Sequence, residues 1–292
     1  MLTFALMLQA AASPAPAPKA PSEIVAAAPA ADWVDIAADD LLIMQLAPDA
    51  AGKARRVLIQ LMPPPFSQPW IANIRALAKA HWWDGTSVNR VQDNYVAQWG
   101  DATEKKALPD GLSKTSEQGY AAPSISFGRG APPRDAYAST RAMRGWPLAS
   151  DGRSSWPVHC YGMVGVGRNM SPDAGSGVEL YTVIGHAPRH LDRNIAVVGR
   201  VVEGIEHLSS LPRGTGGLGF YEDPKERVPV TSIRLASELP QAERPRMQYL
   251  STESATFAAY ADARANRRDA FFIVPAGGAD ICNIPVPIRK RP

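Results

Sequence analysis

Short strand-like apolar runs, each bounded by turn residues, dominate the chain. Val57 to Met62 reads VLIQLM and stops at three consecutive prolines, which is typical of a buried β-strand. The apolar positions that follow have the spacing of one helical face and predict a helix from about Pro69 to His81. Further strands are expected at residues 86–91, 95–100, 162–167, 179–184, 196–202 and, as the last strand, 228–235, with a short helix near Glu203. Because strands outnumber helices and the two do not alternate, the pattern predicts a mainly β barrel or sandwich.

Two stretches depart from this pattern. Residues 102–157 carry many Pro, Gly, Ser and charged residues and few apolar runs, so we expect a long inserted loop outside the core. In the tail, 252–268 has the spacing of an amphipathic helix, and Phe271 to Val274 predicts a strand. Four large apolar side chains would make a poor exposed segment, so residues 239–292 are expected to pack as a C-terminal extension on a domain spanning 32–238.

The N-terminal segment favours export. Leu2 to Ala12 is a short apolar run ending in small residues, which predicts a signal peptide over 1–12, although no Lys or Arg precedes it. Residues 13–31 alternate Pro and Ala and predict an extended linker, so that folded structure begins near Asp32. A periplasmic or secreted protein is therefore expected, and a cytoplasmic protein with a disordered leader remains the alternative.

Composition argues against several classes of binding partner. The net charge is +3 over 292 residues, and Lys and Arg are not interleaved with aromatic residues, so nucleic-acid binding is not expected. No apolar run is long enough for stable membrane insertion. The two cysteines, Cys160 and Cys282, are too few for a zinc finger. They either pair once in an oxidising compartment or stay as separate thiols.

Several blocks of sequence resemble the cyclophilins. WWDGTSVNRV from Trp82 and YVAQWGD from Tyr95 are similar to the family's aromatic pair, its Asp-Gly-Thr turn, its Phe-His-Arg-Val strand and its Phe-x-x-Gln-Gly-Gly-Asp element. Later blocks follow in the family's order: GMVGVGR from Gly162, ELY from Glu179, LDR from Leu191 and VGRVVEG from Val198. The resemblance covers residues 55 to 236. The chain is thus identified as a divergent member of the cyclophilin-type peptidyl-prolyl cis-trans isomerases, which implies a closed β-barrel flanked by two or more helices.

The resemblance also implies a site for X–Pro isomerisation in proline-containing polypeptides, without metal or cofactor. Arg90 matches the family's catalytic arginine, and Gln98 matches the glutamine that bonds the substrate backbone and orients that arginine. The positions implied for substrate binding are Tyr95, Val166, Glu179, Tyr181, His190 and Leu191.

Three departures from the family leave the activity open. Asn89 replaces a histidine, Ile195 replaces a pocket histidine, and Glu179 replaces a glutamine. A carboxylate at 179 could pair with Arg90 and compete with substrate. The leading hypothesis is an isomerase that assists extracytoplasmic folding. The alternatives are a catalytically weak module that holds a protein partner through the cleft or the inserted loop, and a passive structural protein of the cell envelope. No particular oligomeric state is implied.

Overall fold

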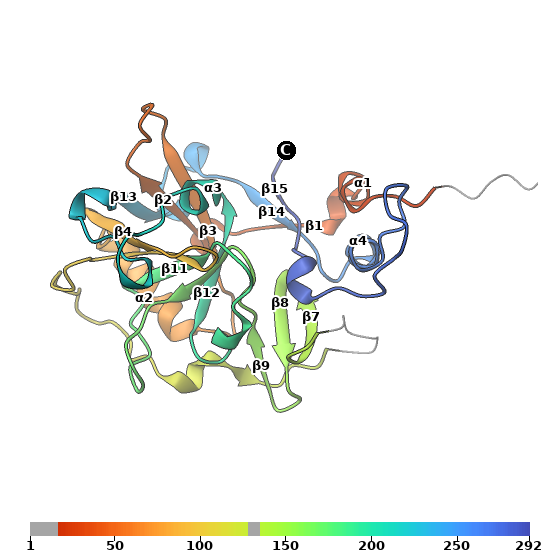
Figure 1. The fold of residues 1–292 in the computed structure, drawn as a ribbon, viewed down its shortest axis with the longest axis horizontal. Coiled ribbons are helices and arrows are strands. Elements are labelled where there is room, and N and C mark those ends of the chain that lie inside the picture. Colours follow the sequence, from red (N-terminus) through yellow and green to blue (C-terminus); the bar gives the residue numbers. More distant parts are fainter. Residues whose placement is uncertain (1–16, 128–134) are drawn as a thin grey trace, which may run out of the picture.

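Eight antiparallel strands close into a barrel in this computed structural model, which describes residues 17–127 and 135–292. The order around the barrel is β10-β11-β5-β4-β13-β2-β3-β12 (Figure 1). The strands are β2 (Leu41–Leu46), β3 (Arg55–Leu61), β4 (Thr86–Val91), β5 (Val96–Gly100), β10 (Met163–Val166), β11 (Leu180–Val183), β12 (Val197–Glu203) and β13 (Val228–Leu235). The closed, mainly β barrel expected from the sequence is therefore confirmed. Among these strands, only β2 was not predicted from the sequence pattern.

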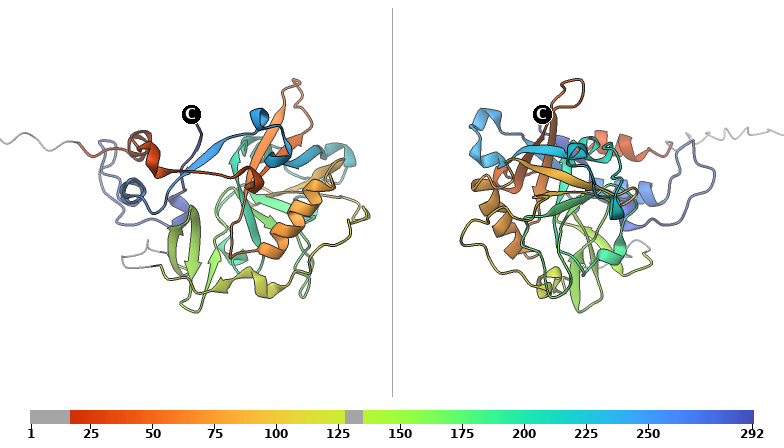
Figure 2. Two further views of the ribbon diagram at one scale, coloured as in Figure 1. Left: turned by 180° about the vertical axis from the view of Figure 1, so that it is seen from behind. Right: turned by 60° about the vertical axis from the view of Figure 1, so that its left-hand side comes forward.

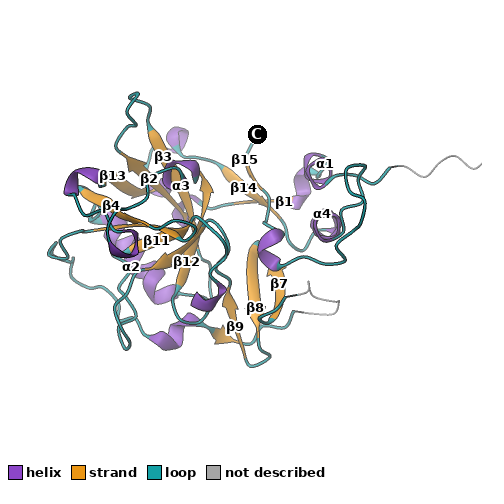
Figure 3. Cartoon of the chain, in the orientation of Figure 1, coloured by secondary structure: helices purple, strands orange, loops and turns teal. Residues whose placement is uncertain are grey.

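Helices α2 (Gln68–Lys79) and α3 (Glu206–Ser209) lie against the outside of the barrel (Figure 3). The longest described helix, α2, packs along the barrel beside β13 (Figure 2). Its buried positions Ile71, Ile74, Leu77 and Ala78 form the apolar face that the sequence predicts. The short helix α3 follows β12, close to its expected position. No described helix has both the length and the apolar character needed to cross a membrane.

The N-terminal segment and the C-terminal extension build one small layer together. Strands β1 (Trp33–Asp35), β14 (Met247–Leu250) and β15 (Ile288–Lys290) form a three-stranded sheet. Helices α1 (Pro21–Ala26) and α4 (Ala255–Ala265) pack against each other at its side (Figure 1).

The prediction of an extended linker over 13–31 was wrong for its second half, where the chain forms α1. This helix forms because Ile24 and Val25 pack on an apolar cluster. That cluster contains Phe257 and Tyr260 of α4. Glu23 also caps α1, since its carboxylate accepts a hydrogen bond from the backbone N–H of Ala20 (2.7 Å). The expected signal peptide and residues 13–16 lie outside the described residues.

The insertion contributes to the core, contrary to the expectation of a loop outside it. Strands β6 (Ala122–Pro123), β7 (Ser139–Met143), β8 (Trp146–Ser150) and β9 (Ser154–Pro157) form a second sheet. Trp146 and Trp156 belong to the same buried cluster as the barrel interior. All five positions of β8 are buried, so this strand lacks the apolar–polar alternation by which a half-buried strand is found in a sequence.

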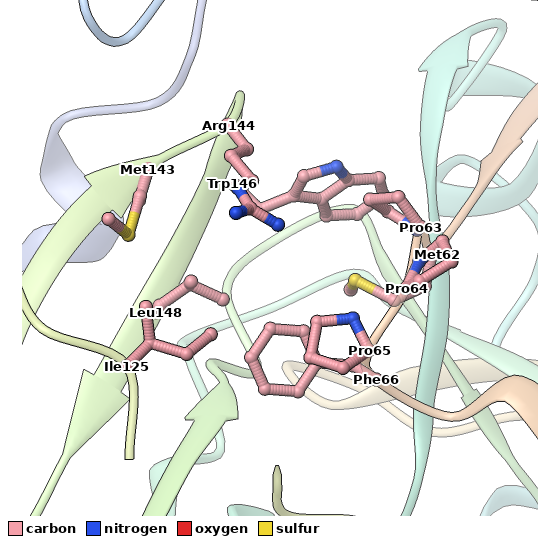
Figure 4. A pocket seen from close by; sticks show the side chains of 10 residues that line it. All are labelled: Met62, Pro63, Pro64, Pro65, Phe66, Ile125, Met143, Arg144, Trp146 and Leu148. Carbon is pink, nitrogen blue, oxygen red and sulfur yellow. The ribbon is translucent and has the colours of Figure 1, made fainter. Parts of the chain in front are cut away.

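The seam between barrel and insertion is tightly closed. Figure 4 shows side chains of the segment Met62–Phe66 facing Met143, Trp146 and Leu148 across a cavity. Its volume is about 10 Å³, which holds no more than one water molecule.

A buried arginine ties three parts of the molecule together. On β12, the Nε and Nη2 groups of Arg200 donate to Oε1 of Gln60 (2.9 and 2.7 Å), and its Nη1 donates to the carbonyl oxygen of Gly145 (2.6 Å). The guanidinium also lies over the rings of Trp146 (4.4 Å) and Tyr249 (5.7 Å). Burial lowers the pKa of Arg200 to about 9. Barrel, insertion and C-terminal extension thus meet on one side chain.

The C-terminal extension differs from its expected form at two points. Strand β13 is not the last strand, since β14 and β15 follow it. Phe271 to Val274 form no strand, and Ile273 is 96 % exposed. The free edge of β14 that they could have joined is occupied by β15. The expected helix is present as α4, and Cys282 forms a disulfide with Cys160 just before β10.

Candidate functional site

Backbone pairing alone brings the central residues together. Across neighbouring strands, Arg90 lies opposite Gln98, Gln98 opposite Tyr181, and Tyr181 opposite Gly165. Directly opposed residues of antiparallel strands share a face of the sheet. The alternate residues, such as Trp99 and Leu180, are buried in the barrel core. The row therefore lies on the outer face of the barrel.

Arg90 is held in place on several sides. Its Nε donates to the carbonyl oxygen of Leu218 (2.8 Å), its Nη1 donates to Oε1 of Gln98 (3.1 Å), and its Nη2 donates to Oε1 of Gln92. The rings of Tyr95 and Phe220 flank the guanidinium at 5.6 and 5.4 Å. Burial lowers its pKa, but an arginine keeps its charge at neutral pH. The site thus contains a fixed cation with planar donors.

A cleft of about 710 Å³ runs along this row. Its apolar corner consists of Tyr95, Tyr181, Leu191 and Ile195, which cluster with Val96. Exposed side chains of Leu218 and Phe220 flank Arg90. A ring-shaped apolar group of a ligand can therefore lie within reach of a fixed cation.

Most residues expected at the site line this cleft. They are Arg90, Tyr95, Gln98, Glu179, Tyr181 and Leu191. Val166 does not, and the expectation that it forms a pocket wall was wrong. Its side chain is fully buried in the barrel core, because the pleat turns Val164 and Val166 inward and Gly165 outward. His190 is exposed and stacks on the Tyr95 ring (centroids 6.2 Å apart), but it is not among the lining residues.

Glu179 interacts with Gln98 and not with Arg90. Its Oε2 accepts a hydrogen bond from Nε2 of Gln98 (3.2 Å), and no ion pair with Arg90 occurs within the part of the chain that the structure describes. The amide of Gln98 is thereby oriented at both ends, since its oxygen accepts from Arg90. In place of the expected competition of Glu179 for Arg90, two hydrogen bonds run in sequence: Arg90 donates to Gln98, and Gln98 donates to Glu179.

The protonation of Glu179 is sensitive to pH near neutrality. Burial raises its pKa to about 7, with smaller upward contributions from Glu104 and Asp101, while hydrogen bonds from Gln98 and Asn89 act in the opposite direction. Its carboxyl lies over Gly100, where a Cβ atom would come within 2.0 Å of Oε1. A glycine at 100 is therefore required for this arrangement.

Three residues that contact Arg90 were not among the site residues expected from the sequence. Gln92, Leu218 and Phe220 all contact it, and Phe220 forms a β-bridge with it. Leu218 and Phe220 lie in or beside the Gly-rich segment 214–219, whose composition suggests only a flexible loop. Two large apolar residues in such a loop were the available signal. No cluster suited to a metal ion occurs in the ranges 17–127 and 135–292.

A family model and a solved structure support the family and the fold of this chain. A family model described as cyclophilin type peptidyl-prolyl cis-trans isomerase/CLD matches residues 68–235, more than half of the chain. The fold is similar to the crystal structure of cyclophilin AquaCyp293 from Hirschia baltica, with a TM-score of 0.64 and 23 % identity over 88 % of this chain and 92 % of that chain. A cyclophilin type peptidyl-prolyl cis-trans isomerase from Cryptosporidium parvum matches with a TM-score of 0.41 and 11 % identity over 67 % and 96 % of the two chains. No curated protein matches the sequence.

We expect the Glu179→Gln variant to lose a pH dependence of stability that the wild type has. The folded carboxyl has a pKa of about 7 against its ordinary 4.5, so the folded protein keeps a proton that the unfolded chain releases. Stability from this group is fully present below pH 4.5 and is lost as the pH rises through 7. The loss between pH 5 and pH 8 should be on the order of 2 kcal/mol.

Urea unfolding at the two pH values measures this loss. Glu206→Gln, which removes an exposed carboxyl, serves as the control and should unfold as the wild type does. An unchanged pH dependence in the Glu179→Gln variant would contradict the assignment.

Proposed function

Because the chain belongs to the cyclophilin-type peptidyl-prolyl cis-trans isomerases, we propose that it accelerates the isomerisation of X–Pro bonds in proline-containing polypeptides. One observation carries the proposal. The guanidinium of Arg90 is fixed beside the apolar corner formed by Tyr95, Tyr181 and Leu191.

The chemistry requires binding and electrostatics only. Rotation about a peptide bond has a barrier of about 18–20 kcal/mol because the C–N bond has double-bond character. An X–Pro bond populates both isomers but exchanges slowly. A catalyst must bind the proline ring and stabilise the twisted bond, in which conjugation is lost. Tyr95, Tyr181 and Leu191 provide the apolar surface for the ring, and Arg90 provides the donor.

Arg90 retains donors for a substrate. A guanidinium has five N–H groups. Within the described residues, Arg90 uses three of them, toward Leu218, Gln98 and Gln92. The remaining N–H groups on Nη1 and Nη2 are available to a substrate carbonyl or to the pyramidal imide nitrogen. Gln98, oriented by Glu179, keeps the arginine in that position.

A weak binding module is the second candidate, and one observation favours it. Two N–H groups of Arg90 already donate to the Leu218 carbonyl and the Gln92 amide. Hydrogen bonds from Arg90 to a twisted substrate would therefore stabilise the transition state less. In that case the cleft would hold a proline-containing segment of a partner without useful turnover.

Isomerisation assays on Arg90→Ala test the enzyme proposal. We expect kcat/KM on a proline-containing tetrapeptide to fall by about 100-fold, as for the loss of a donor that acts on the transition state. Arg56→Ala is the control, because Arg56 lies on β3 and pairs with Glu203 outside the cleft. If the wild type binds such peptides but accelerates none of a series with different residues before proline, the binding module is the correct reading.

We also propose that the protein folds and acts outside the cytoplasm. Two features support this location: the apolar leader over residues 1–12 and the disulfide between Cys160 and Cys282. Disulfides persist in oxidising compartments and are rare in the cytosol. Folding of exported proteins would supply the proline-containing substrates.

Cell fractionation combined with N-terminal sequencing checks the location. The expected product is an extracytoplasmic protein whose first residue lies near Ser13 and which shows no free thiol after denaturation. A cytosolic protein that retains Met1 and titrates two thiols would refute the proposal.

A further inference from the structure

The hydroxyl group of Tyr181 lies behind the cleft, between His159 and Gly165. Tyr181 is 4 % exposed, and its hydroxyl oxygen lies 3.0 Å from Nε2 of His159. The two rings stack with centroids 6.4 Å apart. On the neighbouring strand, a Cβ atom at Gly165 would come within 2.3 Å of this oxygen. Only a glycine there leaves room for the hydroxyl.

His159 is itself held rigidly. It is fully buried, and both its Nδ1 and its backbone N–H lie 3.0 Å from Oδ1 of Asp192. Burial would raise the pKa of Asp192, but hydrogen bonds from His159 and Arg189 together hold it below its ordinary value. Asp192 is therefore a carboxylate that accepts the Nδ1–H of His159. The Nε2 lone pair is left to accept the hydrogen bond from Tyr181.

The network continues into the insertion and the C-terminal extension. Nε of Arg189 donates to Oδ2 of Asp192 (2.8 Å). Its Nη1 donates to Asp135 (2.7 Å) and, at a longer 3.4 Å, to Asp280. Asp280 also caps the 3-10 helix Ile281–Asn283, which carries the cysteine paired with Cys160. The residue after His159 is thus joined covalently to the extension.

We propose that His159 is a positioning residue for the proline pocket. By holding the far end of the Tyr181 ring, it fixes the wall against which a proline ring packs. His159 does not line the cleft, so it acts through Tyr181 alone. This inference rests on the proposed function of the cleft. Asp192 and Arg189 orient His159, and the extension and insertion support them.

Two substitutions separate the hydrogen bonds of His159. An asparagine places an amide near the Nδ1 position, so His159→Asn keeps the bond to Asp192 and loses the one to Tyr181. A glutamine places its amide near Nε2, so His159→Gln keeps the bond to Tyr181. Loss of one hydrogen bond corresponds to about a fivefold change in an equilibrium constant. We expect His159→Asn to raise KM for a proline tetrapeptide about fivefold with little change in kcat, and His159→Gln to stay within about twofold.

A double-mutant cycle tests whether His159 acts through the hydroxyl. Tyr181→Phe should raise KM as His159→Asn does, and adding His159→Asn to it should change KM no further. Wild-type KM in a folded His159→Asn variant overturns the inference, and so does an equal effect of His159→Asn with and without the hydroxyl. If His159→Asn does not fold, the KM of the Tyr181→Phe variant tests the inference alone. A wild-type KM in that variant would overturn it.

A binding measurement keeps this test separate from that of the proposed function. The Kd of a proline-containing peptide is compared for the same variants, with urea unfolding to confirm that each is folded. An inactive wild type whose peptide Kd weakens about fivefold in Tyr181→Phe contradicts the enzyme but supports the role of His159. An active wild type with unchanged Kd and KM in the variants overturns only the role of His159.

Discussion

The pairing register of four barrel strands determines the site. Arg90 and Gln98 lie on the consecutive strands β4 and β5, and Gly165 and Tyr181 lie on β10 and β11 further along the chain. The four residues form one row because each is the direct partner of the next. A slip of one residue would turn this row toward the barrel interior. The inward residues prevent such a slip, since Trp99 and Leu180 fill the core and no polar side chain could replace them without a large loss of stability. The barrel core thus specifies the geometry of the cleft.

Two buried arginines join the rest of the chain to this barrel. Arg200 connects β3 and β12 with the insertion and with β14, through Gln60, Gly145 and the ring of Tyr249. Arg189 connects the segment behind the cleft with Asp135 of the insertion and Asp280 of the extension. A buried arginine without its acceptors is costly, so these contacts favour a single arrangement of the parts. The insertion and the extension therefore support the wall of the cleft.

Much of the barrel and of the site was predictable from local pattern. The predicted strands at 86–91 and 228–235 coincide with β4 and β13, and Arg90 and Gln98 lie in the cleft as the resemblance implies. The errors have physical causes. Whether Val166 points into the core or into the cleft depends on the pleat of β10. Strand β8 is buried on both faces, so its sequence shows no alternation of apolar and polar residues. The short helix α1 is stabilised by α4, more than 200 residues later. A helix whose packing partner is this distant in sequence leaves no local signal of that contact.

The most direct test of the account is a crystal structure with a bound proline-containing peptide. The account predicts that the proline ring contacts Tyr95, Tyr181 and Leu191, and that the carbonyl oxygen before proline lies within hydrogen-bond distance of the Arg90 guanidinium. A peptide bound elsewhere, for example on the sheet of the insertion, with the cleft left empty, would contradict it.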